Sequence, residues 1–325
     1  MVDYHIVIIG GGPAGIAAAI EAKKYNSSLK ILLLEREEML GGALNQCVHC
    51  GFEDEFHKDP IAGTEYIQEF VDKLMDLGIE YKLDTTVLSI TEDKVISYVN
   101  PKEAMKEIRA KAVIIATGTR ELFSGNISIP LNKFTGIYTV GTAHKFVNVR
   151  GYLPGKEIVI LGSSDSTLII ARRLLIEGAK IKAIIESSKE LRAKNESSRR
   201  IVEDFDIPVL YGYRVGEVIG SERIEGVIVE HIEENSNEEC CELNEIQCDC
   251  LLISVNFLPE KELGDKIGLN INKETLGIEV DDKYRTNLEG IFAAGGVTRG
   301  YDTASVCIKE GKIAGIEACK YCLDK

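Results

Sequence analysis

Residues 5–35 read HIVIIGGGPAGIAAAIEAKKYNSSLKILLLE and predict a strand, a helix and a second strand. The apolar runs at both ends are typical of short buried strands, and the alanine-rich run between them favours a helix. In such a unit the first glycine permits a tight turn, the second lets the backbone approach a pyrophosphate, and the third lets helix and strand pack closely. The helix N-terminus attracts phosphates, and an acid that ends the second strand accepts hydrogen bonds from an adenosine ribose. The predicted dinucleotide contacts are Gly10, Gly12, Pro13, Ala14, Gly15, Glu35 and Arg36.

A second copy of this pattern occupies residues 157–186, EIVILGSSDSTLIIARRLLIEGAKIKAIIE, and predicts a duplicated α/β fold with parallel strands. Its loop differs, because Ser164 carries a Cβ where backbone should approach a phosphate, and Thr167 is bulky at the contact of helix and strand. A nucleotide site and a structural relic therefore both stay open. If a nucleotide binds, Glu186 favours NADH, since a carboxylate accepts from a 2′-hydroxyl but repels a 2′-phosphate and no arginine is expected beside it. The candidate contacts are Gly162, Ser164, Asp165 and Glu186.

Composition excludes several classes of protein. The chain has 325 residues, enough for about two domains, and its formal net charge of −14 offers no basic face to nucleic acid. No apolar run is long enough for a transmembrane helix, and the first buried strand begins too soon after Met1 for a secretory leader. A cytoplasmic protein is expected, in which the 9 cysteines are more often thiols, metal ligands or redox groups than disulfides.

Further segments continue the pattern to the end of the chain. ATG at 116–118 follows a predicted strand, and GIFAAGGV at 290–297 precedes the last predicted helix. Together with the two repeated units, in this order, they resemble the pyridine-nucleotide–disulfide oxidoreductase superfamily in its short, thioredoxin-reductase-like form. The resemblance implies two Rossmann-like domains, with FAD bound by residues 1–122 and 256–325 and NAD(P)H by an inserted domain of residues 123–255. It also implies flavin contacts at Gly42, Val87, Ala116, Thr117, Gly118, Gly295, Gly296, Thr303 and Ala304.

One subgroup of that superfamily is the most similar. GGALNQCVH at 41–49, YTVGTA at 138–143 and ARRLLIEGAK at 171–180 carry this closer resemblance. The subgroup contains flavin subunits that accompany other dehydrogenase subunits, among them opine oxidase, hydrogen cyanide synthase, dye-linked proline dehydrogenase and a protein associated with glycerol-3-phosphate dehydrogenase. The chain departs from the superfamily at Gly296, where an aspartate usually holds the ribityl chain of the flavin. One hydrogen bond to FAD is therefore missing or comes from backbone.

The motif CVHC at 47–50 follows the second glycine pair. The resemblance implies that this stretch passes close to the flavin ring, and a CxxC at a helix start can have a lowered thiol pKa. The candidate catalytic residues are therefore Cys47, His49 and Cys50, acting as a redox dithiol with an assisting imidazole. Packing around the flavin and contact with a metal stay open as alternatives, because the register of the motif matches neither of the superfamily's usual dithiols.

Four more cysteines cluster in CCELNEIQCDC at 240–250, which reads as a hairpin. The alternation of Cys248 and Cys250 places both on one strand face. Their spacing matches no common zinc or iron–sulfur motif, so packed thiols are favoured and no metal ligand is predicted.

These residues together predict an FAD-dependent oxidoreductase. Hydride or electrons would pass through flavin N5 between NADH and a second acceptor or donor, while the protein positions the ring. The alternatives are a non-autonomous electron-transfer subunit of a dehydrogenase complex, whose second loop binds no nucleotide, and a thiol redox sensor. A partner dehydrogenase or electron-carrier subunit and a homodimer are possible partners. The sequence names neither the substrate nor the acceptor.

Overall fold

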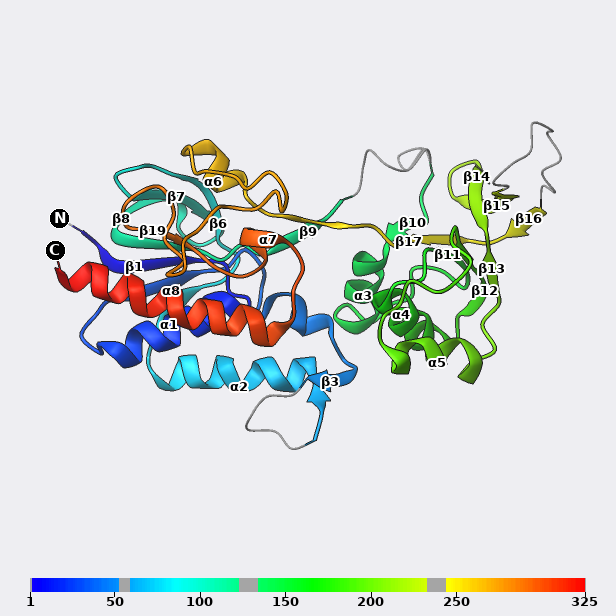
Figure 1. The fold of residues 1–325 in the computed structure, drawn as a ribbon, viewed down its shortest axis with the longest axis horizontal. Coiled ribbons are helices and arrows are strands. Elements are labelled where there is room, and N and C mark those ends of the chain that lie inside the picture. The colour runs from blue at the N-terminus through cyan, green and yellow to red at the C-terminus, as the bar shows by residue number, and fades with distance from the viewer. Residues whose placement is uncertain (1, 53–58, 123–133, 233–243, 325) are drawn as a thin grey trace. The chain divides into compact units, whose positions relative to one another are not determined.

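The computed structural model of the protein describes residues 2–52, 59–122, 134–232 and 244–324. The chain forms two compact units, each with its own sheet and helices (Figure 1). Unit 1 comprises Met1–Arg120 and Phe257–Lys325, and unit 2 comprises Glu121–Asn256. The second unit is thus inserted into the sequence of the first.

A seven-stranded sheet forms the centre of unit 1, in the order β5-β2-β1-β8-β7-β6, with β19 also paired to β8. β1 lies parallel to β2 and to β8, so that Ile6 is opposite Ile31 and Ala112. Strands that are covered on both faces read as nearly continuous apolar runs, which is why HIVII and ILLL lack a polar alternation. The strands are β1 (Tyr4–Ile9), β2 (Ile31–Leu34), β5 (Glu80–Lys82), β6 (Thr86–Ile90), β7 (Val95–Asn100), β8 (Ala104–Ile115) and β19 (Ile291–Ala293), and the two short ladders are β3 (Cys50–Phe52) with β4 (Ile61–Ala62) and β9 (Thr119–Glu121) with β18 (Phe257–Pro259).

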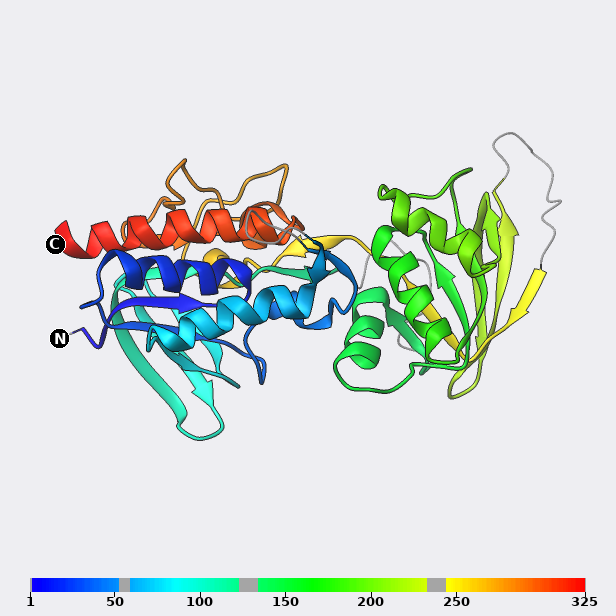
Figure 2. The same ribbon diagram turned by 90° about the horizontal axis from the view of Figure 1, so that it is seen from below.

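Helices α1, α2 and α8 lie side by side along one face of this sheet in both views (Figures 1 and 2). α8 packs closely on α1, because Gly311 and Gly315 bring its backbone against the carbonyl oxygens of Ala14 and Ala18. Apolar side chains between these helices and the sheet form one core, and the opposite face of the sheet carries a second core. The helices of unit 1 are α1 (Pro13–Tyr25), the 3₁₀ helix η1 (Gly42–Gln46), α2 (Gly63–Asp76), α6 (Glu262–Lys266), α7 (Gly296–Arg299) and α8 (Ala304–Asp324).

Unit 2 contains a five-stranded parallel sheet in the order β10-β17-β11-β12-β13. β11 lies between β12 and β17 as β1 lies between β2 and β8, so the strand pattern of unit 1 is repeated. One core lies between this sheet and its helices, and a second lies between the sheet and an antiparallel meander, β14-β15-β16. The elements are β10 (Ile137–Thr139), α3 (Val140–Asn148), β11 (Glu157–Leu161), α4 (Asp165–Ile176), β12 (Lys180–Glu186), α5 (Glu196–Asp204), β13 (Val209–Tyr211), β14 (Tyr213–Gly220), β15 (Ile224–His231), β16 (Asn244–Gln247) and β17 (Cys250–Ile253).

The predicted fold class is confirmed, with both repeated strand–helix–strand units in parallel sheets. The hairpin predicted around residues 240–250 is wrong in its described part. β16 ends at Gln247 in the antiparallel sheet, and β17 begins at Cys250 in the parallel sheet, because the Asp249 carboxylate accepts the amides of Lys156 and Glu157 and turns the chain. Cys248 and Cys250 consequently lie in different cores, whereas Cys240 and Cys241 lie outside the described residues.

Two features of the described residues bear on function. None of the helices there is both long enough and apolar enough to cross a membrane. Across residues 2–52, 59–122, 134–232 and 244–324, no group of three or more His, Cys, Asp or Glu side chains could hold a metal ion.

Candidate functional site

The first glycine loop joins β1 to α1 and leaves the start of the helix open. Its N-cap residue is Gly12, so no side chain caps the amides of the first turn. The first N–H groups of an α-helix lack an intrahelical partner, and a phosphate is a suitable acceptor for them. Pro13, the first residue of α1, has no N–H, so Gly12, Ala14 and Gly15 supply these groups here. Among the described residues beyond its chain neighbours, a Cβ placed on Gly12 would meet Gly42 Cα alone within 4.0 Å. Beside Gly12 there is therefore space that the protein itself does not fill.

A second glycine segment borders this space. The Gly41 amide donates to the Gly11 carbonyl oxygen at 2.8 Å, and a Cβ on Gly42 would lie only 2.9 Å from Gly12 Cα. Gly42 also has a φ of +58°, a conformation that glycine adopts without strain. The two segments thus pass each other backbone to backbone, with no side chain between them.

Glu35 directly follows β2 and is 7% exposed. Its Oε2 accepts the Gly11 amide at 2.6 Å, and its Oε1 accepts the Glu37 amide at 2.8 Å. Each oxygen of an ionised carboxylate has a further lone pair, so Glu35 can still accept the two hydroxyl groups of a ribose. The acid is held rigidly at the carboxyl end of the sheet, where ligands of open α/β folds bind.

The segment after β19 contributes backbone where the superfamily usually has a carboxylate. A Cβ on Gly296 would lie 2.8 Å from Thr119 Cγ2, so the space for a side chain there is already occupied. The Gly295 amide donates to Glu310 Oε2 at 2.8 Å. Glu310 is 2% exposed and forms an ion pair with Arg299. Its carboxylate therefore supports the loop from within the fold.

The remaining predicted flavin contacts occupy scattered places in unit 1. Thr117 donates its hydroxyl to the Glu260 carbonyl at 2.7 Å, and Val87 on β6 packs against the second core. The Thr303 amide donates to Asp302 Oδ1 at 2.7 Å just before α8 begins at Ala304. Ala116 and Gly118 follow β8, and Arg36 is exposed after β2.

Cys47 and Cys50 are free thiols, and neither begins a helix. Cys47 is the C-cap of η1, which corrects the predicted position at a helix start, and Cys50 is exposed on β3. Burial raises the pKa of the Cys47 thiol to about 11. His49 Nδ1 lies 3.1 Å from the Cys50 carbonyl oxygen, and its ring lies 5.3 Å from that of Phe52. Burial therefore disfavours the Cys47 thiolate at neutral pH.

In unit 2, Glu186 ends β12 as Glu35 follows β2, but its surroundings differ. It is 1% exposed, and its oxygens accept the Ser163 hydroxyl at 2.6 Å, the Ser188 amide and hydroxyl at 2.9 Å each, and Arg192 Nε at 3.1 Å. The expectation that no arginine lies beside Glu186 is therefore wrong. Burial alone would raise the pKa of Glu186, but the hydrogen bonds from Ser163 and Ser188 and the charge of Arg192 lower it below its ordinary value.

The second glycine loop is closed by its own side chains. Ser164 is the N-cap of α4, and its hydroxyl accepts the Thr167 amide at 3.3 Å. The same hydroxyl lies 3.0 Å from Ser254 Oγ. Asp165 accepts the amides of Lys194 and Asn195 at 3.0 and 2.9 Å, so it fastens the loop that precedes α5.

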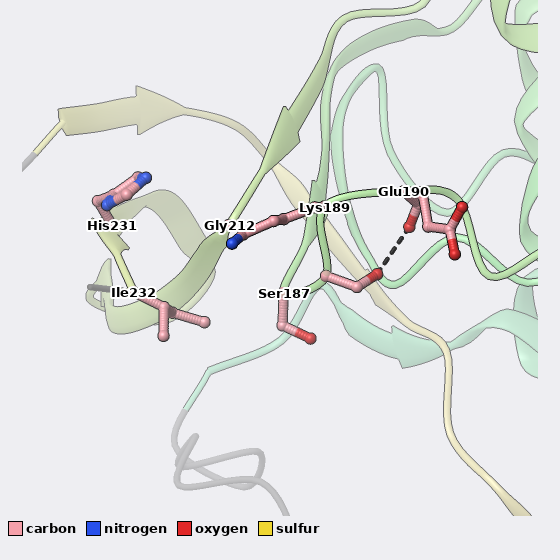
Figure 3. A pocket seen from close by; sticks show the side chains of 7 residues that line it. Ser187, Lys189, Glu190, Gly212, His231 and Ile232 are labelled. Carbon is pink, nitrogen blue, oxygen red and sulfur yellow. Dashed lines mark hydrogen bonds between the residues drawn. The ribbon is translucent and has the colours of Figure 1, made fainter. Parts of the chain in front are cut away.

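A cavity of ≈ 680 Å³ lies just beyond the end of β12 (Figure 3). β12 ends at the edge of this cavity, and the turn after Glu186 forms one side of the cavity. Its lining combines serine hydroxyls with the oppositely charged side chains of Lys189 and Glu190, which suits a hydroxyl-bearing ligand. The lining residues are Ser187, Ser188, Lys189, Glu190, Gly212, His231 and Ile232.

Comparison with known proteins connects both units in one family. The sequence profile described as pyridine nucleotide-disulphide oxidoreductase matches residues 4–311, which include both glycine loops. The chain belongs to this pyridine nucleotide-disulphide oxidoreductase family. The resemblance inferred from the motifs is thereby confirmed at the level of the family.

Two curated relatives of this family member are reductases. Ferredoxin–NADP reductase 2 of Bacillus licheniformis is 28% identical over 319 residues, covering 95% of this chain and 86% of the relative. Thioredoxin reductase of Bacillus subtilis is 29% identical over 300 residues, covering 90% of this chain and 86% of the relative. Among solved structures, the thioredoxin reductase of Lactococcus lactis has a TM-score of 0.78 at 25% identity, over 99% of this chain and 100% of that chain. L-proline dehydrogenase from P. horikoshii shares the fold, with a TM-score of 0.68 at 23% identity over 96% of this chain and 54% of that chain.

Proteins of the pyridine nucleotide-disulphide oxidoreductase family use FAD and NAD(P)H, and the chain is an FAD-dependent oxidoreductase. The residues of unit 1 fit a dinucleotide, because no side chain caps the first turn of α1 and open space lies beside Gly12 at that turn. The loop of unit 2 fits less well, because Ser164 already caps its helix.

Sequence reasoning missed three residues at these places: Glu310, Arg192 and Ser254. Acids among the apolar positions of the last helix, at Glu310 and Glu317, are a signal for Glu310, since buried acids require a partner. Arg192 and Ser254 carry no comparable signal, because each reaches its partner from a loop that only the folded sheet brings near.

Proposed function

We propose that the protein is a flavin-dependent reductase that takes electrons from a nicotinamide nucleotide and passes them directly to a protein acceptor. The observation that carries the proposal is the uncapped first loop, where open space lies beside Gly12 at a helix N-terminus that no side chain caps. Direct transfer is favoured by the thiols, because Cys47 is half-buried with a raised pKa at the end of η1 and Cys50 is exposed on β3. A dithiol relay needs a reactive thiolate, which these surroundings do not favour.

The residues of unit 1 would hold FAD in an extended form. The amides at the start of α1, with Gly12 and Gly42, would bind the pyrophosphate, and Glu35 would accept the ribose hydroxyls. Val87 would lie near the adenine, and the backbone at Gly296 would replace the missing aspartate. The chemistry that bound FAD supplies is acceptance and release of a hydride or of electrons at N5. The chain orients that group and excludes water from it.

Unit 2 would hold the electron donor, with its adenosine end at the cavity beyond β12. Glu186 is buried and its charge is balanced by Arg192, so it neither selects a 2′-hydroxyl strongly nor excludes a 2′-phosphate. Lys189 lines the cavity together with the carboxylate of Glu190, so the lining does not favour one charge strongly. We therefore expect NADH and NADPH to be used with efficiencies within about tenfold of each other, which replaces the simple preference for NADH.

A second function deserves a separate test, because one observation favours it. The Ser164 cap closes the second loop, as expected for a flavin subunit that binds no nucleotide and exchanges electrons with a partner dehydrogenase subunit. The subgroup that the sequence resembles contains flavin subunits that accompany other dehydrogenase subunits. Partner subunits and a homodimer remain predictions, which sedimentation of the purified protein alone and with candidate subunits tests.

Anaerobic reduction separates the two functions. The purified protein should be yellow, should release FAD on denaturation, and should bleach on addition of NADH or NADPH. Bleaching by neither nucleotide would favour the electron-transfer subunit, and a colourless protein that FAD cannot reconstitute would refute both. A variant with Cys47→Ser and Cys50→Ser should reduce a one-electron protein carrier at the wild-type rate. Loss of that activity with normal flavin content would instead establish a dithiol relay.

A further inference from the structure

The two loops of this chain offer an internal comparison at matching positions. In unit 1 the N-cap is Gly12 and the third residue of the helix is Gly15, and no side chain caps the helix. In unit 2 the corresponding residues are Ser164 and Thr167, and the serine hydroxyl accepts the threonine amide. The amide that unit 1 leaves open is therefore already bonded in unit 2.

The Ser164 hydroxyl is fixed by more than this one amide. It lies 2.9 Å from Thr167 Oγ1 and 3.0 Å from Ser254 Oγ, so three groups hold it over the helix end. Ser254 is itself packed against the loop, since a Cβ on Gly162 would lie 2.9 Å from Ser254 Cβ. The serine therefore cannot turn aside without losing several hydrogen bonds.

Thr167 shows that the distance between the glycine loop and its helix differs between unit 1 and unit 2. A Cβ on Gly15 would collide with the Gly10 carbonyl oxygen in unit 1, whereas the Thr167 side chain is fully buried in unit 2 without such a collision. The start of α4 thus stands further from its loop at this point than the start of α1 does. A hydroxyl cap fits the wider space that results.

We propose that Ser164, held by Ser254, limits the affinity of unit 2 for nicotinamide dinucleotides. The Ser164 hydroxyl accepts the hydrogen bond of the Thr167 amide, which a pyrophosphate oxygen would otherwise accept. The Ser164 Cβ lies where the phosphate must approach. Binding of a dinucleotide then requires that this cap be broken. The inference rests on the proposed function only in taking the nicotinamide nucleotide as the ligand of unit 2.

The test uses the FAD-loaded protein and NAD⁺ as a probe that binds without reducing the flavin. Ser164→Gly removes both the hydroxyl and the Cβ, and glycine is tolerated at an N-cap nearly as well as serine, so the fold should persist. We expect the Kd for NAD⁺, measured by calorimetry, to fall about tenfold in this variant. Ser254→Ala should give a smaller decrease in the same direction. Ser166→Ala is the matched control, because it lies in the same turn of α4 without capping it, and its Kd should equal that of the wild type.

Two readouts keep this inference distinct from the proposed function. An unchanged or higher Kd in Ser164→Gly, with thermal unfolding like that of the wild type, would overturn the inference even if NADH still bleaches the flavin. A lower Kd without any bleaching by saturating NADH would support the inference and refute NADH as the donor. Tight binding of NAD⁺ to the wild type, equal to that of Ser164→Gly, would also overturn it.

Discussion

Substitution of Gly12 by alanine should separate cofactor binding from folding. Gly12 has φ −81° and ψ −174°, an extended conformation that alanine adopts without strain. Its added Cβ would lie 4.0 Å from Gly42 Cα, and no other described residue beyond its chain neighbours would be closer. The folded state should therefore tolerate the methyl group, and the free energy of unfolding without FAD should change by less than about 0.5 kcal/mol.

The effect on FAD follows from the same distance. Carbon atoms are in contact at about 3.5–4.0 Å, so the methyl group would fill the gap between the two glycine segments and leave no room for a phosphate oxygen. Loss of one hydrogen bond to a charged acceptor costs about 1.5–3 kcal/mol. Since about 1.4 kcal/mol corresponds to a tenfold change in affinity, FAD should bind about 10- to 100-fold more weakly.

Titration of the FAD-free protein with FAD, followed by flavin fluorescence, measures this affinity, and urea unfolding measures the stability. Gly15→Ala is the matched control, because its Cβ would collide with the Gly10 carbonyl oxygen and should destabilise unit 1 whether or not FAD is present. Wild-type FAD affinity in Gly12→Ala would refute the placement of the pyrophosphate between the two segments. Equal losses of stability in both alanine variants would refute the claim that Gly12 serves the ligand alone.

Three further predictions concern thiols, charge and packing. At neutral pH iodoacetamide should label Cys50 before Cys47, because burial raises the pKa of Cys47 to about 11. Mass spectrometry of the labelled peptides measures the order of labelling, and earlier labelling of Cys47 would contradict the prediction. Glu186→Gln should destabilise unit 2 by about 2 kcal/mol at neutral pH. Because the pKa of Glu186 is lowered in the folded state, its carboxylate stabilises unit 2 above the ordinary pKa of 4.5. This stabilisation is lost as the pH falls through the lowered pKa, so the unfolding free energies of wild type and variant, measured with urea, should converge in acid. A difference that stays constant with pH would contradict this. Gly311→Ala should force α8 away from the Ala14 carbonyl and cost about 1–3 kcal/mol, whereas the exposed Lys309→Ala on the same helix should change the melting temperature little.

Much of the fold follows from local sequence because the elements that matter are short, apolar and bounded by glycine. The strands ending at Ile9, Leu34 and Leu161 lie where the apolar runs predict them. Burial on both faces of a parallel sheet leaves little else for such runs to form. The hairpin predicted near Cys248 was wrong because periodicity cannot show that a chain leaves one sheet and enters another within two residues.

The candidate site was less predictable, because its details depend on side chains that reach across loops. The sequence could place Glu186 at the end of a strand, but not the Arg192 side chain that folds back upon it. It could show that Gly296 lacks a carboxylate, but not that Thr119 fills the vacated space. Such contacts join residues that become neighbours only after the sheet has formed.

The two acids at the strand ends show which part of a dinucleotide motif depends on a ligand. Glu35 accepts the Gly11 amide and the amide two residues ahead, and Glu186 accepts the Ser163 hydroxyl and again the amide two residues ahead. The same bonds thus form in a loop that is open and in a loop that Ser164 closes. These bonds tie the strand end to the glycine loop and stabilise the fold with or without a nucleotide. An acid at this position is therefore a weaker indication of nucleotide binding than an uncapped helix, and by that criterion unit 1 carries the stronger site.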